Sequence, residues 1–306
     1  MTDRVVARLG EGLADPDAPL LRVDDLGVLR GDGVFETILV IDGAAVELEA
    51  HLVRLARSAA MLDLPAPDLA SWRSCAQTVI DAWDGGREMT LRLILTRGPE
   101  TRSQGRGGSS EGGGGVTGYA IGAPVSPTLP AQRRDGVAAV TLTRGTAPDL
   151  AAQAPWLLLG AKTLSYAMNM AAVRHAERLG AQDVVFTAAD GSVLEGPTST
   201  VVVAQHGTLC TPPVELGILP GTTQTALFRA AEAAGLPTRV QPLTVPDLLA
   251  AEGVWLCSSV RLVTRVHTLD GHPLPDTGLT PRLLGLLPLP ATPAALLMLP
   301  GQRRRD

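Results

Sequence analysis

The chain contains 306 residues, of which 26 are basic and 31 are acidic, and its formal net charge is −5. The basic residues are dispersed, so the sequence shows no nucleic-acid-binding surface. No run of about 18 apolar residues could cross a membrane, and the N-terminus lacks the pattern of a secretory signal. We therefore expect a soluble cytoplasmic protein, long enough for two domains with a core each.

The cysteines and histidines predict no metal centre. The three cysteines lie far apart, without the short paired spacing of zinc or redox motifs, and the five histidines show no ligand spacing either. We expect the cysteines to be small buried hydrophobic residues.

The first part of the chain, residues 1–122, predicts a mixture of strands and helices. An alternating apolar stretch ends at the turn pair Asp42-Gly43, which is typical of a hairpin, and apolar residues then recur at helical spacing. The expected elements are strands at Val34–Ile41 and Ala44–Leu48, helices at His51–Leu62 and Leu69–Trp83, and strands at Met89–Thr96 and Val116–Gly122. Residues 99–115 are rich in glycine and serine, so they predict a flexible loop between the last two strands.

Residues 123–130 contain three prolines and have the composition of an interdomain linker, which leaves residues 131–306 as a second domain. Its expected elements are a strand at Gly136–Leu142, a helix at Ser165–Leu179, strands at Asp183–Thr187 and Thr200–Ala204, a helix from Gly221 to Gly235, and a last strand at Gly253–Ser258. The tail from Pro273 is expected to be mostly irregular. The order of these elements lacks the regular spacing of a doubly wound sheet, so it favours an α+β fold.

Lysine usage is the most informative anomaly of the composition. Of the 26 basic residues, 25 are arginine and one, Lys162, is lysine. Arginine supplies charge and hydrogen bonds, but it stays protonated and cannot act as an amine nucleophile. Schiff-base chemistry requires a lysine, and the apolar stretch Trp156–Ala161 before Lys162 would desolvate its ammonium group. Composition alone leaves open that Lys162 survived by chance.

Two further features suit a site for pyridoxal 5′-phosphate (PLP), which needs a lysine, a partner for its pyridine nitrogen and an anion site. Glu195 lies at a strand end and could hold the pyridinium proton, although it could also be a solvated turn residue. In Gly217–Gln224, glycines precede Thr222 and Thr223 at a predicted helix N-terminus, which is typical of a phosphate cradle or of an ordinary capped helix. Arg54 could add a charged phosphate ligand, and Ser259 a hydroxyl.

Taken in order, the segments of residues 27–271 resemble the fold-type IV PLP enzymes. This group contains branched-chain aminotransferases, D-amino-acid aminotransferases and 4-amino-4-deoxychorismate lyases. The matching segments are Gly31-Asp-Gly-Val-Phe-Glu-Thr37, His51-Leu-Val-Arg-Leu55, Leu95-Thr-Arg-Gly98, Lys162-Thr-Leu-Ser-Tyr166, Gly191-Ser-Val-Leu-Glu-Gly196, Gly217–Thr223 and Leu269-Asp-Gly271.

The resemblance implies a small N-terminal α/β domain, a larger C-terminal domain with a β-barrel-like sheet, PLP bound at their interface, and a homodimer. It implies that Lys162 forms the Schiff base and that Glu195 binds the pyridine nitrogen. Tyr166 would contact the phenolic oxygen of the cofactor. The implied phosphate ligands are Arg54, Thr222, Thr223 and Ser259.

The sequence around Lys162 and Glu195 is most similar to that of the aminodeoxychorismate lyases of high-GC bacteria. Branched-chain aminotransferases typically have a glycine-rich stretch after the lysine and an asparagine where this chain has Thr200. The resemblance therefore implies a lyase that releases pyruvate and 4-aminobenzoate. The alternatives are an aminotransferase for D-amino acids or branched-chain amino acids, and a noncatalytic PLP-binding protein. Arg97, Arg30 and Arg261 are candidate ligands for a substrate carboxylate.

Overall fold

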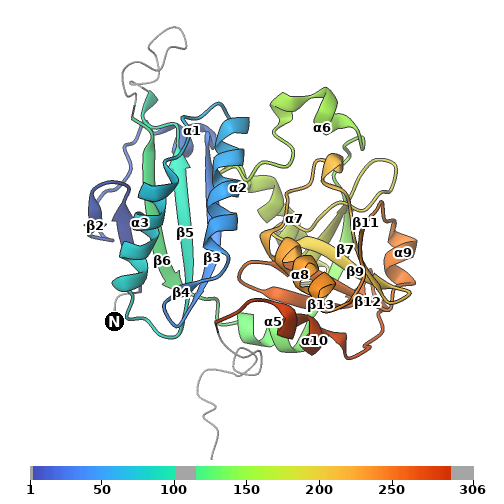
Figure 1. The fold of residues 1–306 in the computed structure, drawn as a ribbon. Coiled ribbons are helices and arrows are strands. Elements are labelled where there is room, and N and C mark those ends of the chain that lie inside the picture. The colour runs from blue at the N-terminus through green and yellow to red at the C-terminus, as the bar shows by residue number, and fades with distance from the viewer. Residues whose placement is uncertain (1–2, 101–114, 291–306) are drawn as a thin grey trace, which may run out of the picture. The chain divides into compact units, whose positions relative to one another are not determined.

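The structure is a computed structural model that describes residues 3–100 and 115–290. Its contacts divide the chain into two compact units. The first unit comprises Met1–Val125 and Ala161–Tyr166, and the second comprises Ser126–Gly160 and Ala167–Asp306. Each unit combines one sheet with several helices (Figure 1), which confirms the predicted α+β class.

The first unit is built on an antiparallel sheet, in which six strands are seen within the described residues, in the order β2-β1-β6-β5-β3-β4. The long strands β3 and β5 pair over their whole length, from Gly33 opposite Thr96 to Ile41 opposite Glu88. The strands are β1 (Val5–Arg8), β2 (Gly12–Ala14), β3 (Gly33–Ile41), β4 (Ala44–Ala45), β5 (Glu88–Thr96) and β6 (Thr117–Pro124).

Two amphipathic helices, α2 (Leu48–Met61) and α3 (Leu69–Asp81), contact this sheet and each other (Figure 1). The short helix α1 (Leu26–Arg30) precedes β3. The predicted partner strand Ala44–Leu48 is wrong beyond Ala45. Glu47 adopts a left-handed backbone conformation (φ 53°), which turns the chain out of the hairpin so that α2 begins at Leu48.

The second unit is built on a mixed sheet in the order β11-β10-β9-β12-β13-β7-β8, and β14 pairs with β13. Parallel pairing joins β13 to β7, β7 to β8, and β10 to β11. The strands are β7 (Val137–Thr143), β8 (Asp183–Thr187), β9 (Thr200–Gln205), β10 (Thr208–Thr211), β11 (Thr238–Val240), β12 (Gly253–Ser258), β13 (Leu262–Leu269) and β14 (His272–Pro273).

Helices and short 3-10 turns complete the second unit, and β-branched residues such as Val201, Val203 and Val254 fill its core. The helical segments are α5 (Leu129–Asp135), α6 (Leu150–Gln153), η1 (Pro155–Leu157), α7 (Ala167–Arg178), η2 (Val214–Leu216), α8 (Thr222–Ala233), α9 (Val245–Leu249) and α10 (Leu279–Leu286). In residues 3–100 and 115–290, no helix has the length and apolar character needed to cross a membrane.

The end of the chain is more regular than its sequence predicts. Gly253–Ser258 is not the last strand, because β13 and β14 follow it. The tail from Pro273 is not irregular throughout, since α10 buries Leu283 and Leu284. Pro281 is tolerated because it lies in the first turn of α10, where a missing N–H breaks no helical hydrogen bond. The rest of the tail, residues 291–306, and residues 101–114 of the predicted flexible loop lie outside the described residues.

The two units are divided between Val125 and Ser126, a position inside the expected linker of residues 123–130. Part of that segment is regular, because β6 extends to Pro124 and α5 begins at Leu129. The grouping of Ala161–Tyr166 also differs from the prediction, which assigned all of residues 131–306 to one domain. This segment pairs with β3: Phe35 N donates to Lys162 O (3.1 Å), and Leu164 N donates to Gly33 O (2.8 Å). Because β4 covers only the end of β3, the beginning of that strand remains open for this pairing.

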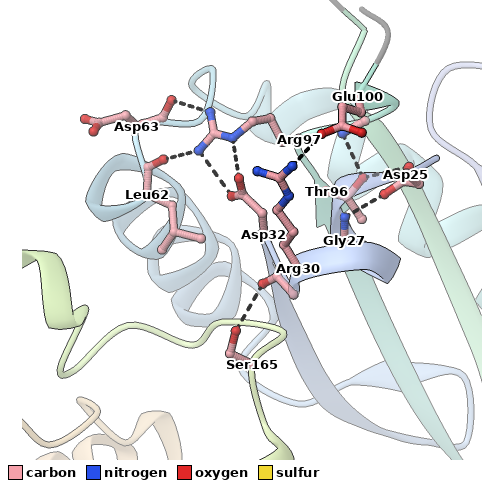
Figure 2. A network of polar contacts seen from close by, with 12 residues as sticks. Asp25, Gly27, Arg30, Asp32, Leu62, Asp63, Thr96, Arg97, Glu100 and Ser165 are labelled. Carbon is pink, nitrogen blue, oxygen red and sulfur yellow. Dashed lines mark hydrogen bonds and ion pairs between the residues drawn. The ribbon is translucent and has the colours of Figure 1, made fainter. Parts of the chain in front are cut away.

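A buried aspartate fixes the entry to β3. Asp25 is fully buried and caps α1 by accepting a hydrogen bond from Gly27 N (2.8 Å). It also accepts hydrogen bonds from the hydroxyls of Thr96 on β5 (3.1 Å) and Thr117 on β6 (2.7 Å). Figure 2 shows the contacts to Gly27 and Thr96. One carboxylate therefore joins a helix N-terminus to two strands.

We expect Asp25→Ala to lower the free energy of unfolding by about 3 kcal/mol, because it leaves buried donors without an acceptor. Asp68→Ala is the matched control. Asp68 caps α3 in the same way but is exposed, so its loss should lower the free energy of unfolding clearly less than the loss of Asp25 does. Urea unfolding monitored by circular dichroism measures both. Equal losses would show that the contacts of Asp25 to the strands contribute nothing.

Candidate functional site

The backbone of Lys162 is held from two sides within the first unit. Its carbonyl accepts the hydrogen bond from Phe35 N on β3, and its N–H donates to the hydroxyl of Ser58 on α2 (3.0 Å). Ser58 is buried, so this bond is shielded from water. The lysine therefore extends from a fixed stretch of backbone.

The side chain of Lys162 is 8% exposed and lies among aromatic groups. Its Nζ is 4.0 Å from the centroid of the Phe35 ring and donates to the hydroxyl of Tyr166 (3.3 Å). The rings of Phe35 and Tyr166 meet edge to face, with centroids 5.1 Å apart. Aromatic faces attract an ammonium group but solvate it less well than water does. These surroundings suit an amine that must react in its neutral form.

A buried charged cluster lies on the adjoining face of α2. Both oxygens of Glu36, which is fully buried on β3, accept hydrogen bonds from Arg54, each at 2.7 Å. His51 Nδ1 contacts Glu36 Oε2, also at 2.7 Å. The pairing uses the two-pronged geometry that arginine offers to carboxylates. Arg54, the predicted phosphate ligand, is thus held in one orientation by Glu36.

The charges of this cluster follow from its surroundings. Burial raises the pKa of Glu36, but the charge of Arg54 and the hydrogen bonds from Arg54 and His51 outweigh that effect and lower it to about 2. Burial lowers the pKa of His51, and the hydrogen bond to Glu36 opposes that shift. At neutral pH the cluster therefore contains an ionised Glu36, a charged Arg54 and a neutral His51, whose Nδ1–H donates to the carboxylate.

Glu195 is the corresponding acid of the second unit, and the structure buries it rather than leaving it as a solvated turn residue. Its Oε1 lies 3.1 Å from Nη1 of Arg144, and its Oε2 accepts a hydrogen bond from Leu219 N (3.0 Å). Its backbone is bonded to Phe186 on β8. Glu195 is therefore fixed in position and has a cation beside it.

Leu219 lies within the predicted phosphate cradle, Gly217–Gln224, and the N-cap of α8 follows two residues later. Gly221 is the N-cap of α8 and provides no side-chain cap, so the threonines are the first helical residues and not caps. The side chains of Thr222 and Thr223 are buried. A Cβ at Gly221 would lie 2.2 Å from Oγ1 of Thr200, so only glycine allows this close packing. Buried hydroxyls and first-turn amides at one helix N-terminus form a donor set that suits a phosphate group.

The remaining candidates of the second unit lie in the turn between β12 and β13. Ser259 is half-buried there, and Nη2 of the buried Arg133 holds the turn by donating to Val260 O (2.6 Å). Arg261 forms an ion pair with the buried Asp183. That pairing gives Arg261 a partner within the chain, so its geometry does not support a role as a substrate ligand.

Arg97 and Arg30, the other predicted carboxylate ligands, lie in the first unit (Figure 2). Arg97 forms a two-pronged contact with Asp32 (2.7 and 3.2 Å) and donates to the carbonyls of Leu62 and Asp63. It therefore ties the end of β5 to the residues that follow α2, and we do not retain it as a substrate ligand. Arg30 is exposed and pairs with Glu100.

The structure thus gathers the candidates into two groups. Lys162, Tyr166 and Arg54 belong to the first unit, and Glu195, Thr222, Thr223 and Ser259 belong to the second. Sequence reasoning assigned no role to Glu36, His51 or Arg144. Among the described residues, no cluster of histidine, cysteine, aspartate and glutamate could hold a metal ion.

Comparisons with known proteins show the family of the chain. Residues 33–269 match the family described as amino-transferase class IV. A bifunctional aminodeoxychorismate lyase / D-amino acid transaminase from Mycobacterium tuberculosis is 48% identical over 282 residues, which are 89% of this chain and 94% of the relative.

Solved structures of aminotransferases are also similar to this chain. A hypothetical aminotransferase from Mycobacterium tuberculosis, with alpha-ketoglutarate and PMP bound, has a TM-score of 0.86 and 48% identity, and the match covers 92% of this chain and 96% of the other. A PLP-bound form of that protein gives the same TM-score. A fold IV transaminase from Curtobacterium pusillum has a TM-score of 0.83 and 43% identity, with coverage of 92% and 97%.

The Glu36 cluster predicts a specific pH dependence of stability. Glu36→Gln leaves Arg54 buried without its counter-charge and should cost about 3 kcal/mol at pH 7. Because the pKa of Glu36 is lowered from 4.5 to about 2 on folding, its contribution is present above pH 4.5 and is lost as the pH falls toward 2. The difference between wild type and variant should therefore shrink across that window.

Urea unfolding at a series of pH values measures this difference. Glu49→Gln is the control, since Glu49 contacts Arg73 with the same two-pronged geometry (2.7 and 2.8 Å) on the surface. Because water screens this exposed pair, we expect Glu49→Gln to change the free energy of unfolding much less than Glu36→Gln does, at every pH of the series. If the loss of unfolding free energy caused by Glu36→Gln stays constant from pH 7 to pH 3, the assignment of an ionised Glu36 is wrong.

Proposed function

Because the chain belongs to the class IV aminotransferase family, we propose that it is a PLP-dependent 4-amino-4-deoxychorismate lyase. This lyase would release pyruvate and 4-aminobenzoate, a folate precursor. The observation that carries the proposal is the setting of Lys162, the single lysine of the chain, whose Nζ lies in a buried aromatic environment beside Tyr166. The lyase named in the Mycobacterium relative supports the choice of substrate.

The residues present fit the cofactor. Lys162 offers the side-chain amine that the aldehyde requires, Glu195 offers a carboxylate for the ring N–H, and the start of α8 offers buried threonine hydroxyls and first-turn amides for the phosphate. Ser259 and Arg54 would add phosphate contacts, and Tyr166 would contact the phenolic oxygen.

When bound, PLP supplies an aldehyde that condenses with amines and a pyridinium ring that accepts electrons from a substrate carbon. Lys162 would hold that aldehyde, and its Nζ would serve as the base that removes a substrate proton. The hydroxyl of Tyr166, 3.3 Å from Nζ, would orient the amine, and the ring of Phe35 would exclude water from one side. Aromatisation to 4-aminobenzoate favours loss of pyruvate.

A second activity, transamination of D-amino acids, is favoured by the name of the same Mycobacterium relative. The proton at the amino acid Cα would be removed by the same amine of Lys162.

We also propose that the enzyme acts as a homodimer in the cytoplasm. Multi-angle light scattering would test the dimer, and cell fractionation would test the location.

The first test concerns Lys162. We expect borohydride to attach PLP covalently to the wild-type chain, with the added mass on the peptide that contains Lys162. Lys162→Arg keeps the charge but has no reactive amine, so it should show no attachment at this position and lose activity by about 10³-fold or more.

Arg57→Lys provides the control, because it places a second lysine on the exposed face of α2. The label should remain on Lys162 in that variant. A label distributed over both lysines would show that the reaction is nonspecific, and unaltered activity in Lys162→Arg would overturn the catalytic assignment.

The second test separates the two activities. With aminodeoxychorismate alone we expect equimolar pyruvate and 4-aminobenzoate, measured by coupled lactate dehydrogenase assay and by fluorescence. D-alanine with alpha-ketoglutarate should give slower formation of pyruvate and glutamate. If amino transfer occurs and aminodeoxychorismate yields neither product, the chain is an aminotransferase and the lyase proposal is wrong.

A further inference from the structure

We propose that Arg144 is a positioning residue that keeps Glu195 ionised and oriented, and thereby keeps the pyridine nitrogen of the cofactor protonated. The inference rests on the proposed function, since it concerns how the chain would treat the ring of bound PLP. Arg144 belongs to the second unit, like Glu195, and the geometry that supports this role lies entirely within that unit.

The guanidinium of Arg144 is held in place from several sides. Its residue directly follows β7, and its backbone N–H donates to Thr187 O at the end of β8 (2.8 Å). Its Cζ lies 4.9 Å from the centroid of the Phe186 ring. The Nε is buried without a hydrogen-bond partner in the described structure. A cation is rarely buried in this way unless it is paired with an anion.

Arg144 forms an ion pair with Glu195. The side chains of Arg144 and Glu195 are 10% and 12% exposed, and Nη1 lies 3.1 Å from Oε1. Water therefore screens the pair only weakly, and the guanidinium charge favours the ionised form of the carboxyl group.

The orientation of Glu195 is fixed by three further bonds. Leu219 N donates to Oε2 (3.0 Å), while Oε1 contacts Arg144. The backbone bonds Phe186 N to Glu195 O and Leu194 N to Phe186 O hold the Glu195 backbone beside β8. Phe186 thus supports both members of the ion pair.

An ionised carboxylate stabilises a protonated ring nitrogen, whereas a neutral carboxyl group does so less. Arg144 should therefore influence the cofactor only through Glu195 and the ring nitrogen. This separates it from a residue that merely stabilises the fold, because a ligand without that nitrogen would be insensitive to Arg144.

The experiment compares Arg144→Met with wild type by equilibrium binding of two ligands to the apoenzyme: PLP and 1-deaza-PLP, in which CH replaces the ring nitrogen. A nearby opposite charge typically shifts a protonation equilibrium by about tenfold or more, so we expect PLP to bind the variant about tenfold more weakly. The dissociation constant of the deaza analogue should change by less than about twofold, because sites that do not interact affect each other no more than that. Nitrogen-15 NMR of labelled PLP should show a larger neutral fraction of the ring in the variant.

Arg265→Met is the matched control. Arg265 also lies in the second unit, contacts a carboxylate at 3.1 Å (Asp276) and has a buried Nε without a partner in the described residues. We expect it to leave the binding of both ligands unchanged. In a Glu195→Gln background, Arg144→Met should add no further selective loss of PLP binding.

Equal weakening of both ligands by Arg144→Met, or unchanged PLP binding and an unchanged nitrogen-15 shift, would overturn the role of Arg144. Failure of the proposed function looks different, since wild type itself would then bind no PLP and form no covalent bond at Lys162.

Discussion

The carboxylate of Glu36 is fully buried, and it can remain ionised there only because Arg54 and His51 neutralise and solvate it. Glu36 lies on β3 and both partners lie on α2, so neutralising the charge also fixes the helix against the strand. The same two elements hold the backbone of Lys162, through Phe35 and Ser58. The position of Lys162 therefore depends on the Glu36–Arg54 pair, because that pair joins the two elements that hold its backbone.

The second unit fixes its own buried acid differently. Both oxygens of Glu36 accept hydrogen bonds from Arg54, so one side chain holds that carboxylate. Glu195 instead contacts Arg144 through Oε1 and the backbone N–H of Leu219 through Oε2. Two segments that are far apart in the sequence therefore contribute to the position of Glu195.

Sequence reasoning identified the features whose signals are local. The composition singled out Lys162, and glycines before threonines predicted the start of α8. Glu36 carries a signal that could have been used, because period-two alternation places it on the same buried face of β3 as Val34 and Ile38. Arg144 carries none, since Glu195 lies 51 residues away. The pairing of residues 161–166 with β3 is likewise nonlocal, and so was invisible in the sequence.

The division of labour between arginine and lysine follows from these contacts. At Arg54 and Arg97 the chain uses the planar guanidinium to bind both oxygens of one carboxylate, which a lysine cannot reproduce. In the proposed reaction, position 162 would need the opposite property, an amine that can lose its proton and form a covalent bond. That requirement would account for a lysine at this position in a chain whose other basic residues are all arginine. The identity of the substrate is not constrained in the same way, because Lys162, Glu195 and the start of α8 would serve a lyase and an aminotransferase equally well.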